Sequence, residues 1–192
     1  MGSEYELKYR ADRETLSSIF TTFPARWQTI VMETTYYDTP SGSLSARRWT
    51  LRRRMENQIS ICTLKTPGVG LERGEWEVAC ESIEKAIPKL CKLGAPQELS
   101  QLSKEGLVVS CGARFTRQAA TFSLRDCVME FALDQGVLLG GGKEIPLCEL
   151  EVELKEGNRE SMETYAAELA GIYNLKIEEK SKFARALALC EE

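Results

Sequence analysis

The sequence predicts an α+β fold in which eight antiparallel β-strands close into a barrel, or tunnel, with a charged interior and flanking helices. Segments of alternating polar and apolar residues, the pattern of β-strands, are separated by short turns and fall into two groups around a helical stretch. Several strands carry charged residues on one face and apolar residues on the other. Closure into a barrel removes the exposed edges that an open antiparallel sheet would leave.

The first half of the chain predicts one helix and five strands. Asp12 is a suitable N-cap for the helix, whose apolar residues from Leu16 to Phe23 recur at helical spacing before Pro24 ends it. The segment 38–42 is rich in turn-forming residues and separates the second strand from the third. The strands are expected over residues 4–8, 29–38, 49–55, 59–66 and 74–80.

The second half predicts the remaining strands and most of the helices. Ser82 caps a helix over residues 83–93, which Pro88 is expected to interrupt, and a shorter helical segment covers residues 97–104. Asn158 caps a helix over residues 159–173. The chain shows no internal repeat, low-complexity tract or linker, so residues 1–192 are expected to form one domain. Three further strands and a final helix are expected over residues 113–124, 127–137, 144–155 and 181–190.

The composition restricts the chemistry that the protein can use. With 25 basic and 29 acidic residues the net charge is −4, which predicts no general attraction to nucleic acid or to anionic membranes. The absence of histidine excludes Ser-His-Asp catalysis, Cys-His catalysis and His-ligated metal sites. An enzyme of this composition depends on carboxylates, lysines, arginines and hard cations such as Mg²⁺ or Mn²⁺.

The cysteines and the apolar segments predict a cytoplasmic protein. The seven cysteines include no Cys-x-x-Cys pair, and such an odd, scattered set is typical of reduced thiols. The sequence has no secretory signal pattern and no apolar run of membrane-spanning length.

The charged strand faces predict a functional interior. Taken alone, Glu4-x-Glu6-x-Lys8 suits the solvated face of a half-buried strand. The segment 148–155, however, places three glutamates on one face, which is unfavourable on an exposed strand because neighbouring like charges repel. If such faces line the tunnel, the carboxylates can bind cations and the basic side chains can bind phosphates. The other strands with charged faces contribute Arg52, Arg54, Lys65, Glu75, Glu77, Arg117, Glu130 and Asp134.

Short motifs follow one another along nearly the whole chain. They are Glu4-x-Glu6-x-Lys8, Thr35-Tyr36-Tyr37-Asp38-Thr39-Pro40, Leu51-Arg52-Arg53-Arg54, Thr63-Leu64-Lys65, the segments 131–136 and 148–154, and Ser181-Lys182 with Arg185. This ordered set resembles the CYTH superfamily, also called triphosphate tunnel metalloenzymes. It is most similar to the bacterial inorganic triphosphatases of that superfamily.

The resemblance implies hydrolysis of inorganic triphosphate to diphosphate and phosphate inside the tunnel, with Mg²⁺ or Mn²⁺. It implies metal-binding carboxylates at Glu4, Glu6, Asp134, Glu149, Glu151 and Glu153, and leaves open which two of the last three glutamates reach the metal. Glu4, Glu6, Lys8, Glu149 and Glu151 are the catalytic residues that it implies. Arg117 is the implied phosphate ligand of this strand in place of Arg114, because Phe115-x-Arg117 fits the family pattern better. The implied phosphate ligands are Lys8, Arg52, Arg54, Lys65, Arg117, Lys182 and Arg185.

The resemblance leaves alternative functions open. The same superfamily includes adenylate cyclases, thiamine triphosphatases and nucleoside triphosphatases, although no residues dedicated to a base or a ribose 3′-hydroxyl are identified here. A non-catalytic polyphosphate-binding module would keep the basic residues and lose carboxylates, all of which are present. Related bacterial triphosphatases often carry a C-terminal helical CHAD domain. Because the chain ends at Glu192, we expect either a standalone protein or an excised domain.

Overall fold

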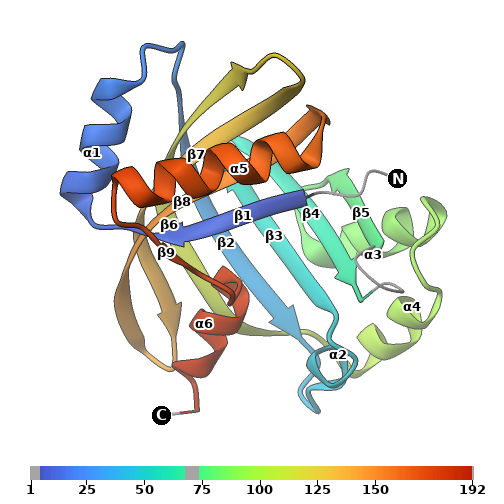
Figure 1. The fold of residues 1–192 in the computed structure, drawn as a ribbon. Coiled ribbons are helices and arrows are strands. Elements are labelled where there is room, and N and C mark those ends of the chain that lie inside the picture. Colours follow the sequence, from blue (N-terminus) through green and yellow to red (C-terminus); the bar gives the residue numbers. More distant parts are fainter. Residues whose placement is uncertain (1–4, 68–73, 192) are drawn as a thin grey trace.

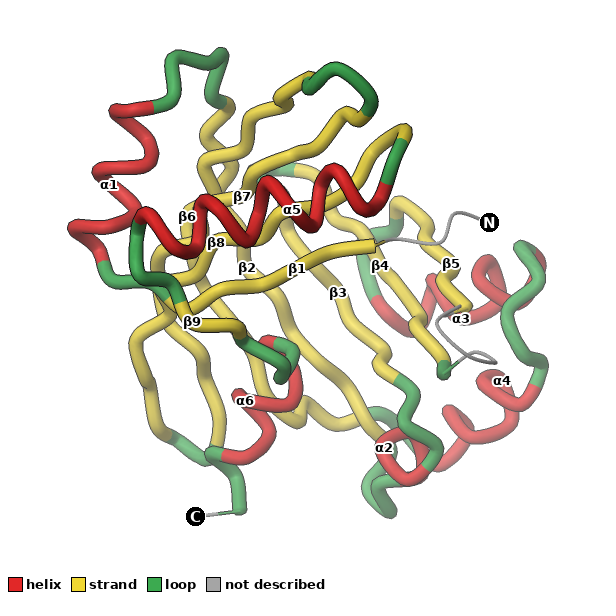
Figure 2. The backbone as a smooth tube through the Cα atoms, in the orientation of Figure 1, coloured by secondary structure: helices red, strands yellow, loops and turns green. Residues whose placement is uncertain are grey.

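The computed structural model describes residues 5–67 and 74–191. In these residues one antiparallel sheet of nine strands curves around a central space, with most of the helices packed on its outer side (Figure 1, Figure 2). The strands are β1 (Tyr5–Arg10), β2 (Gln28–Asp38), β3 (Thr50–Glu56), β4 (Ile59–Thr66), β5 (Gly74–Ala79), β6 (Val108–Ser123), β7 (Cys127–Gly140), β8 (Lys143–Gly157) and β9 (Lys176–Ile177).

The α+β class and the antiparallel pairing are confirmed, but the closed eight-stranded barrel is not. The strand order is β5-β4-β3-β2-β6-β7-β8-β1-β9, and within the described residues no ladder joins β5 to the opposite edge. Strand β9 pairs only with Tyr9 and Arg10, so no second ladder among the described residues covers the first part of β1. A strand of two residues, Lys176 and Ile177, is too short to show alternation, which is why the sequence did not predict β9.

The helices follow the expected positions closely. Each of the predicted caps Asp12, Ser82 and Asn158 accepts a hydrogen bond from the backbone N–H three residues later, which confirms these helix starts. No helix in residues 5–67 and 74–191 is long and apolar enough to cross a bilayer. The helices are α1 (Arg13–Thr22), α2 (Ser43–Ala46), α3 (Ile83–Lys92), α4 (Glu98–Leu102), the 3₁₀ helix η1 (Ser103–Glu105), α5 (Arg159–Ile172) and α6 (Lys182–Ala188).

The expected interruption of the helix at Pro88 is wrong, because α3 continues through this residue. The apolar face of α3 holds Ile83, Ile87 and Leu90, and all three are buried against the outer side of the sheet. Burial of these side chains outweighs the backbone hydrogen bond that a proline inside a helix forfeits.

Strand β6 begins at Val108, five residues before its expected start at Ala113. Its early part pairs with the end of β2 across an irregularity between Tyr36 and Tyr37. Gly112 lies in this part, and a Cβ atom there would meet the Thr34 carbonyl oxygen at 2.9 Å. Glycine therefore allows the two backbones to approach closely, and it also conceals the alternation that marks a strand.

Apolar clusters pack both sides of the curved sheet. Helices α3 and α4 cover β3, β4 and β5, while α1 and α5 cover β1, β7 and β8. Helix α6 packs on the inner side instead, where Ala186 and Leu189 join Leu138, Leu147 and Phe115. The inner side is thus filled by apolar side chains at the end near α6, and the rest of it remains for charged groups.

Candidate functional site

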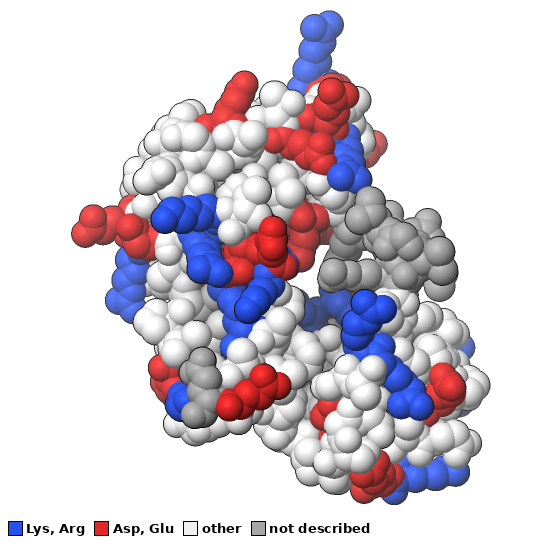
Figure 3. Space-filling view, turned by 60° about the horizontal axis from the view of Figure 1, so that its bottom comes forward, with Lys and Arg blue, Asp and Glu red and all other residues white. Residues whose placement is uncertain are grey.

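The concave side of the sheet encloses a cavity of about 590 Å³. An opening bordered by basic and acidic side chains is visible in the space-filling view (Figure 3). The inner faces of the strands line this cavity together with the start of α6, as the repeated charged faces predicted. Its charged lining residues include Glu6, Lys8, Arg52, Arg54, Lys65, Glu75, Glu77, Arg117, Glu130, Glu151, Glu153 and Lys182.

Three carboxylates gather on one wall, and we call them the three-carboxylate group. Asp134 comes from β7, and Glu149 and Glu151 come from β8, where the register places Asp134 directly opposite Glu149. One oxygen of each side chain lies within 4.8 Å of the others. Asp134 and Glu149 are fully buried, so the group lies deep in the protein and its charges require partners.

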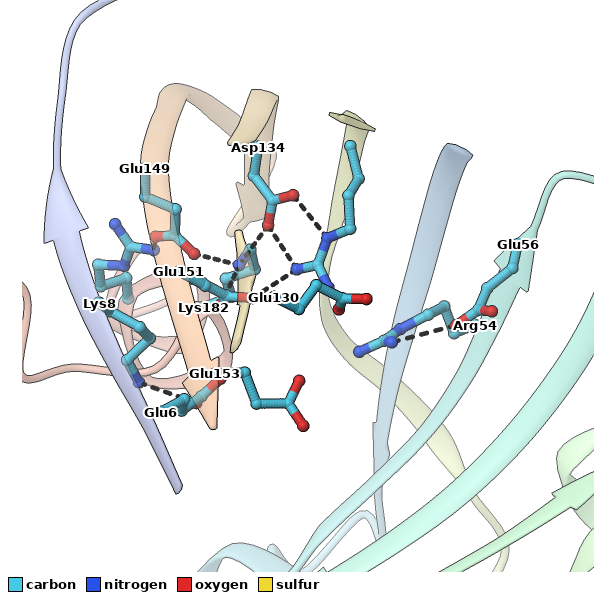
Figure 4. A network of polar contacts seen from close by, with 12 residues as sticks. Glu6, Lys8, Arg54, Glu56, Glu130, Asp134, Glu149, Glu151, Glu153 and Lys182 are labelled. Atoms are coloured by element: carbon cyan, nitrogen blue, oxygen red, sulfur yellow. Dashed lines mark hydrogen bonds and ion pairs between the residues drawn. The ribbon is translucent and has the colours of Figure 1, made fainter. Parts of the chain in front are cut away.

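Cations from β6 and α6 provide those partners (Figure 4). Lys182 Nζ lies 2.7 Å from both Asp134 Oδ2 and Glu151 Oε1, and it also forms an ion pair with Glu149. Arg117 donates to both Asp134 oxygens at 2.7 Å and to Glu151 Oε2 at 2.5 Å. Arg185 forms an ion pair with Glu149. Three cations therefore surround three carboxylates.

These contacts hold Glu151 and Lys182 in their charged forms. Burial opposes the ionisation of Glu151, but the charges of Lys182 and Arg117 outweigh it and hold the pKa of that carboxyl below its ordinary value. Burial likewise opposes the charge of Lys182, yet the carboxylates, Glu151 first, raise the pKa of its ammonium. Burial, in contrast, raises the pKa of Glu149, against the charges of Lys182 and Arg185.

The wall formed by β3 is basic, and hydrogen bonds among the described residues do not satisfy all of its donors. Arg52 and Arg54 point to the inner face, and the Nε atom of each is buried without a hydrogen-bond partner in the described part of the chain. Arg54 Nη1 lies 3.2 Å from Glu56 Oε1. Burial, and then the neighbouring charge of Arg54, lower the pKa of Arg52. Buried guanidinium groups of this kind call for an anion in the cavity.

Two cavity carboxylates outside the three-carboxylate group, Glu75 and Glu6, pair with lysines. Glu75 Oε2 lies 3.0 Å from Lys65 Nζ. Glu6 Oε1 lies 3.7 Å from Lys8 Nζ. Burial, and then the charge of Glu151, raise the pKa of Glu6. Glu4, the first residue of the expected motif, lies outside the described residues.

The structure shows which glutamates of β8 lie together. Glu149 and Glu151 belong to the three-carboxylate group, whereas Glu153 Oε2 lies 2.7 Å from Lys155 Nζ. Lys155 also approaches Glu130 at 3.4 Å. Sequence reasoning did not single out Lys155, although it continues the alternation of the three glutamates and so could have been found.

Arg185 is held by a carboxylate that the sequence analysis missed. Glu178 is buried just before α6 and accepts hydrogen bonds from Arg10 Nε at 2.5 Å and Arg185 Nη1 at 3.4 Å. The segment 178–180 has the pattern of a charged surface turn, so nothing in the sequence signalled its burial. Arg114, in contrast, pairs with Glu144 at 2.5 Å where both side chains are exposed, and it is not part of the cavity lining.

The three-carboxylate group fits a divalent metal by its chemistry. Its donors are all carboxylate oxygens, which Mg²⁺ and Mn²⁺ prefer over softer ligands. The ammonium of Lys182 lies among these oxygens, which shows that the position accepts a cation. Asp134, Glu149 and Glu151 could therefore hold the metal, and the metal-binding roles of Glu6 and Glu153 stay predictions.

Comparison with known proteins agrees with this arrangement. An inorganic triphosphatase from Haemophilus influenzae is 34% identical over 135 residues, which cover 68% of this chain and 38% of that protein. The chain therefore spans well under half the length of this relative.

Solved structures share the fold at low identity. A putative adenylyl cyclase from Hippeastrum, described as having a dominant triphosphatase activity, superposes with a TM-score of 0.66 at 16% identity, covering 96% of this chain and 94% of that one. A protein from Pyrococcus horikoshii gives a TM-score of 0.59 at 20% identity, with 96% and 98% covered. The CYTH domain family model matches residues 2–187. Because this match spans every strand that lines the cavity, the chain belongs to the CYTH family of domains.

Proposed function

We propose that this domain hydrolyses inorganic triphosphate to diphosphate and phosphate with the help of Mg²⁺ or Mn²⁺. The observation that carries the proposal is the buried Nε of Arg52 and of Arg54, which lack hydrogen-bond partners among the described residues and lie in the cavity that Glu151 of the three-carboxylate group also lines. Figure 4 shows Arg54 across the cavity from these carboxylates. Such a cavity is complementary to a metal–polyphosphate complex, which presents cation and anion together. The Haemophilus influenzae relative, an inorganic triphosphatase, supports the reaction type.

The basic residues bind and orient the triphosphate in this proposal. Arg52 and Arg54 each offer several N–H donors, and a charge-assisted hydrogen bond contributes about 1.5–3 kcal/mol. Lys8 of β1 and Lys65 of β4 border the cavity from near opposite ends of the strand order and add ammonium groups. Phosphoryl transfer depends mainly on positioning and charge stabilisation, so an enzyme without histidine can carry it out.

Glu6 is the proposed proton acceptor for the attacking water. Its carboxylate faces the cavity and is not a member of the three-carboxylate group, and its raised pKa makes it a stronger proton acceptor than an ordinary glutamate. Arg52 and Arg54 stabilise the negative charge of the departing diphosphate. Asp134, Glu149 and Glu151 would hold a divalent metal, which would supply further charge neutralisation.

The cavity wall favours inorganic triphosphate over substrates with an organic group. A nucleobase or a thiamine ring needs apolar or aromatic surface to pack against. Met32 and Phe115 are on the wall, but only 3% and 5% of their surfaces are exposed, and the larger apolar side chains that are half-buried there are Ile30 and Phe183. The lining is otherwise rich in charged side chains, which suit phosphate groups. A purely binding role is less favoured, because cation-binding carboxylates are retained beside the basic residues.

Phosphate release from a panel of substrates tests this proposal. Inorganic triphosphate, diphosphate, ATP and thiamine triphosphate are compared with Mg²⁺, with Mn²⁺ and without added metal. We expect inorganic triphosphate to be hydrolysed fastest and only with metal. Faster hydrolysis of ATP, or formation of cyclic AMP, would refute the substrate assignment.

A further inference from the structure

We propose that Lys182 occupies the metal position of the three-carboxylate group in the metal-free protein and must leave it when a divalent metal binds. The inference rests on the proposed function, because it takes that group as the metal site. It assigns to Lys182 a positioning role that a permanent salt bridge would not have, since the same ammonium contacts the carboxylates in one state and faces the cavity in the other.

The geometry places the ammonium among the donor atoms themselves. Lys182 Nζ contacts all three members of the group, at 2.7 Å from Asp134 Oδ2 and from Glu151 Oε1. The same side chain borders the cavity, and Nζ lies 5.2 Å from the centre of the Phe115 ring. A lysine has a flexible stem, so its ammonium can turn toward the cavity while the backbone of α6 stays in place.

The charges around the group identify Lys182 as the exchangeable cation. Arg117 is fixed by two parallel hydrogen bonds to Asp134, and Arg185 is shared between Glu149 and Glu178. Lys182 is a point charge without such a planar fork. A divalent metal added beside all three cations would leave an uncompensated positive charge in a buried place, which is unfavourable. Departure of Lys182 removes part of that repulsion and directs an ammonium toward bound phosphate.

Metal affinity in the absence of any phosphate tests the inference. Free Mn²⁺ is measured by electron paramagnetic resonance with the full chain and with Lys182→Met, which keeps the length of the side chain and removes its charge. We expect the variant to bind Mn²⁺ roughly tenfold more tightly or more, because its carboxylates lose their competing cation. Lys182→Arg keeps a cation and should not show this gain.

A matched control is Lys155→Met. Lys155 lies on β8, the strand that carries Glu149 and Glu151, but it pairs with Glu153 and Glu130. Its loss should therefore change Mn²⁺ affinity much less. Equal or weaker Mn²⁺ binding by Lys182→Met than by the unaltered chain would overturn the inference.

A second measurement needs no variant that could fail to fold. The ¹⁵Nζ resonance of Lys182 in the unaltered protein is followed while Mg²⁺ is added, and Lys182→Arg assigns the signal. We expect the resonance to shift in step with Mg²⁺ binding, and an unshifted resonance at saturation would contradict the proposal. Metal binding that is weakened by Glu149→Gln but insensitive to Lys182 would refute this inference alone. Absence of metal binding in every protein would refute the proposed metal-dependent function as well.

Discussion

Lys182 Nζ lies 2.7 Å from Asp134 Oδ2, and thereby joins the start of helix α6 to the middle of strand β7. Asp134 is fully buried and also accepts two hydrogen bonds from Arg117. This contact places the last helix and the charged strand faces in one site. The site thus holds several buried charges together.

Arg52→Met should stabilise the protein while it impairs hydrolysis. The substitution removes a buried guanidinium whose Nε has no hydrogen-bond partner, so the free energy of unfolding should rise by about 1–3 kcal/mol. The same change removes a phosphate ligand, so kcat/KM for triphosphate should fall roughly 10- to 100-fold. Urea denaturation and phosphate release provide the two measurements.

Arg53→Met is the matched control for this substitution. Arg53 is the next residue on β3 and is not part of the cavity lining, and its Nε donates to Ser60 Oγ at 2.9 Å. Its removal should lower stability slightly and leave kcat/KM nearly unchanged. If both variants lost activity to the same extent, the role assigned to Arg52 would be wrong.

Glu6 should titrate above the ordinary range of a glutamate in the metal-free protein. Burial, and then the charge of Glu151, disfavour its ionised form and raise its pKa. Glu151→Gln removes the second cause, so the pKa of Glu6 should fall in that variant. The ¹³C carboxyl resonance of Glu6 reports both values. An ordinary pKa in the unaltered chain would contradict the role proposed for Glu6.

The raised pKa of Glu6 also predicts how hydrolysis depends on pH. A proton acceptor works only when it is ionised, so hydrolysis should decline as the pH falls through the raised pKa of Glu6. This decline should occur at a higher pH than an unperturbed glutamate would give. The pH dependence of kcat/KM at saturating metal tests the direction.

Glu178→Gln should destabilise the protein most at neutral pH. Burial opposes the ionisation of Glu178, but hydrogen bonds from Arg10 and the Lys180 backbone, with the charge of Arg185, hold its pKa below the ordinary value. A lowered carboxyl pKa contributes stability above the unfolded pKa, and this contribution is lost as the pH falls through the folded value. The loss should be about 1–3 kcal/mol at neutral pH and should shrink in acid.

Urea denaturation at several pH values measures this difference. Glu179→Gln is the neighbouring control, because Glu179 is exposed and should change stability little at any pH. A pH-independent loss in Glu178→Gln would show that packing, and not charge, is what the substitution removes.

Much of the site could be predicted because strand alternation fixes the face to which a side chain points. The repeated glutamates of β8 and the arginines of β3 were assigned to the interior from this pattern, and they line the cavity or adjoin it. Alternation does not give depth along a strand or the partner of each charge. Glu153 shares a face with Glu149 and Glu151, yet it pairs with Lys155 instead of joining the three-carboxylate group.

The features that escaped prediction depend on contacts between distant segments. Glu178 is buried because Arg10 of β1 and Arg185 of α6 converge on it, and neither is near it in a recognisable pattern. Whether the sheet closes depends on the relation between β5 and β1, which no local sequence pattern encodes. Pro88 was misjudged because tertiary burial of α3 overrode a local preference.

Glu151→Gln should reduce both metal affinity and hydrolysis, since Glu151 belongs to the three-carboxylate group and contacts Lys182 and Arg117. We expect a loss in Mn²⁺ affinity of roughly tenfold to 100-fold. Glu144→Gln removes a carboxylate from an exposed pair with Arg114 and should have no such effect. If the two variants lost Mn²⁺ affinity to the same extent, the three-carboxylate group would not be the metal site.

The most direct test of the central claim is phosphate release from inorganic triphosphate by the purified chain, measured before and after chelation of divalent metal. We predict release with Mg²⁺ or Mn²⁺, its loss on chelation, and its return when metal is restored. Release that continues without metal, or no release with either metal, would contradict the proposed triphosphatase.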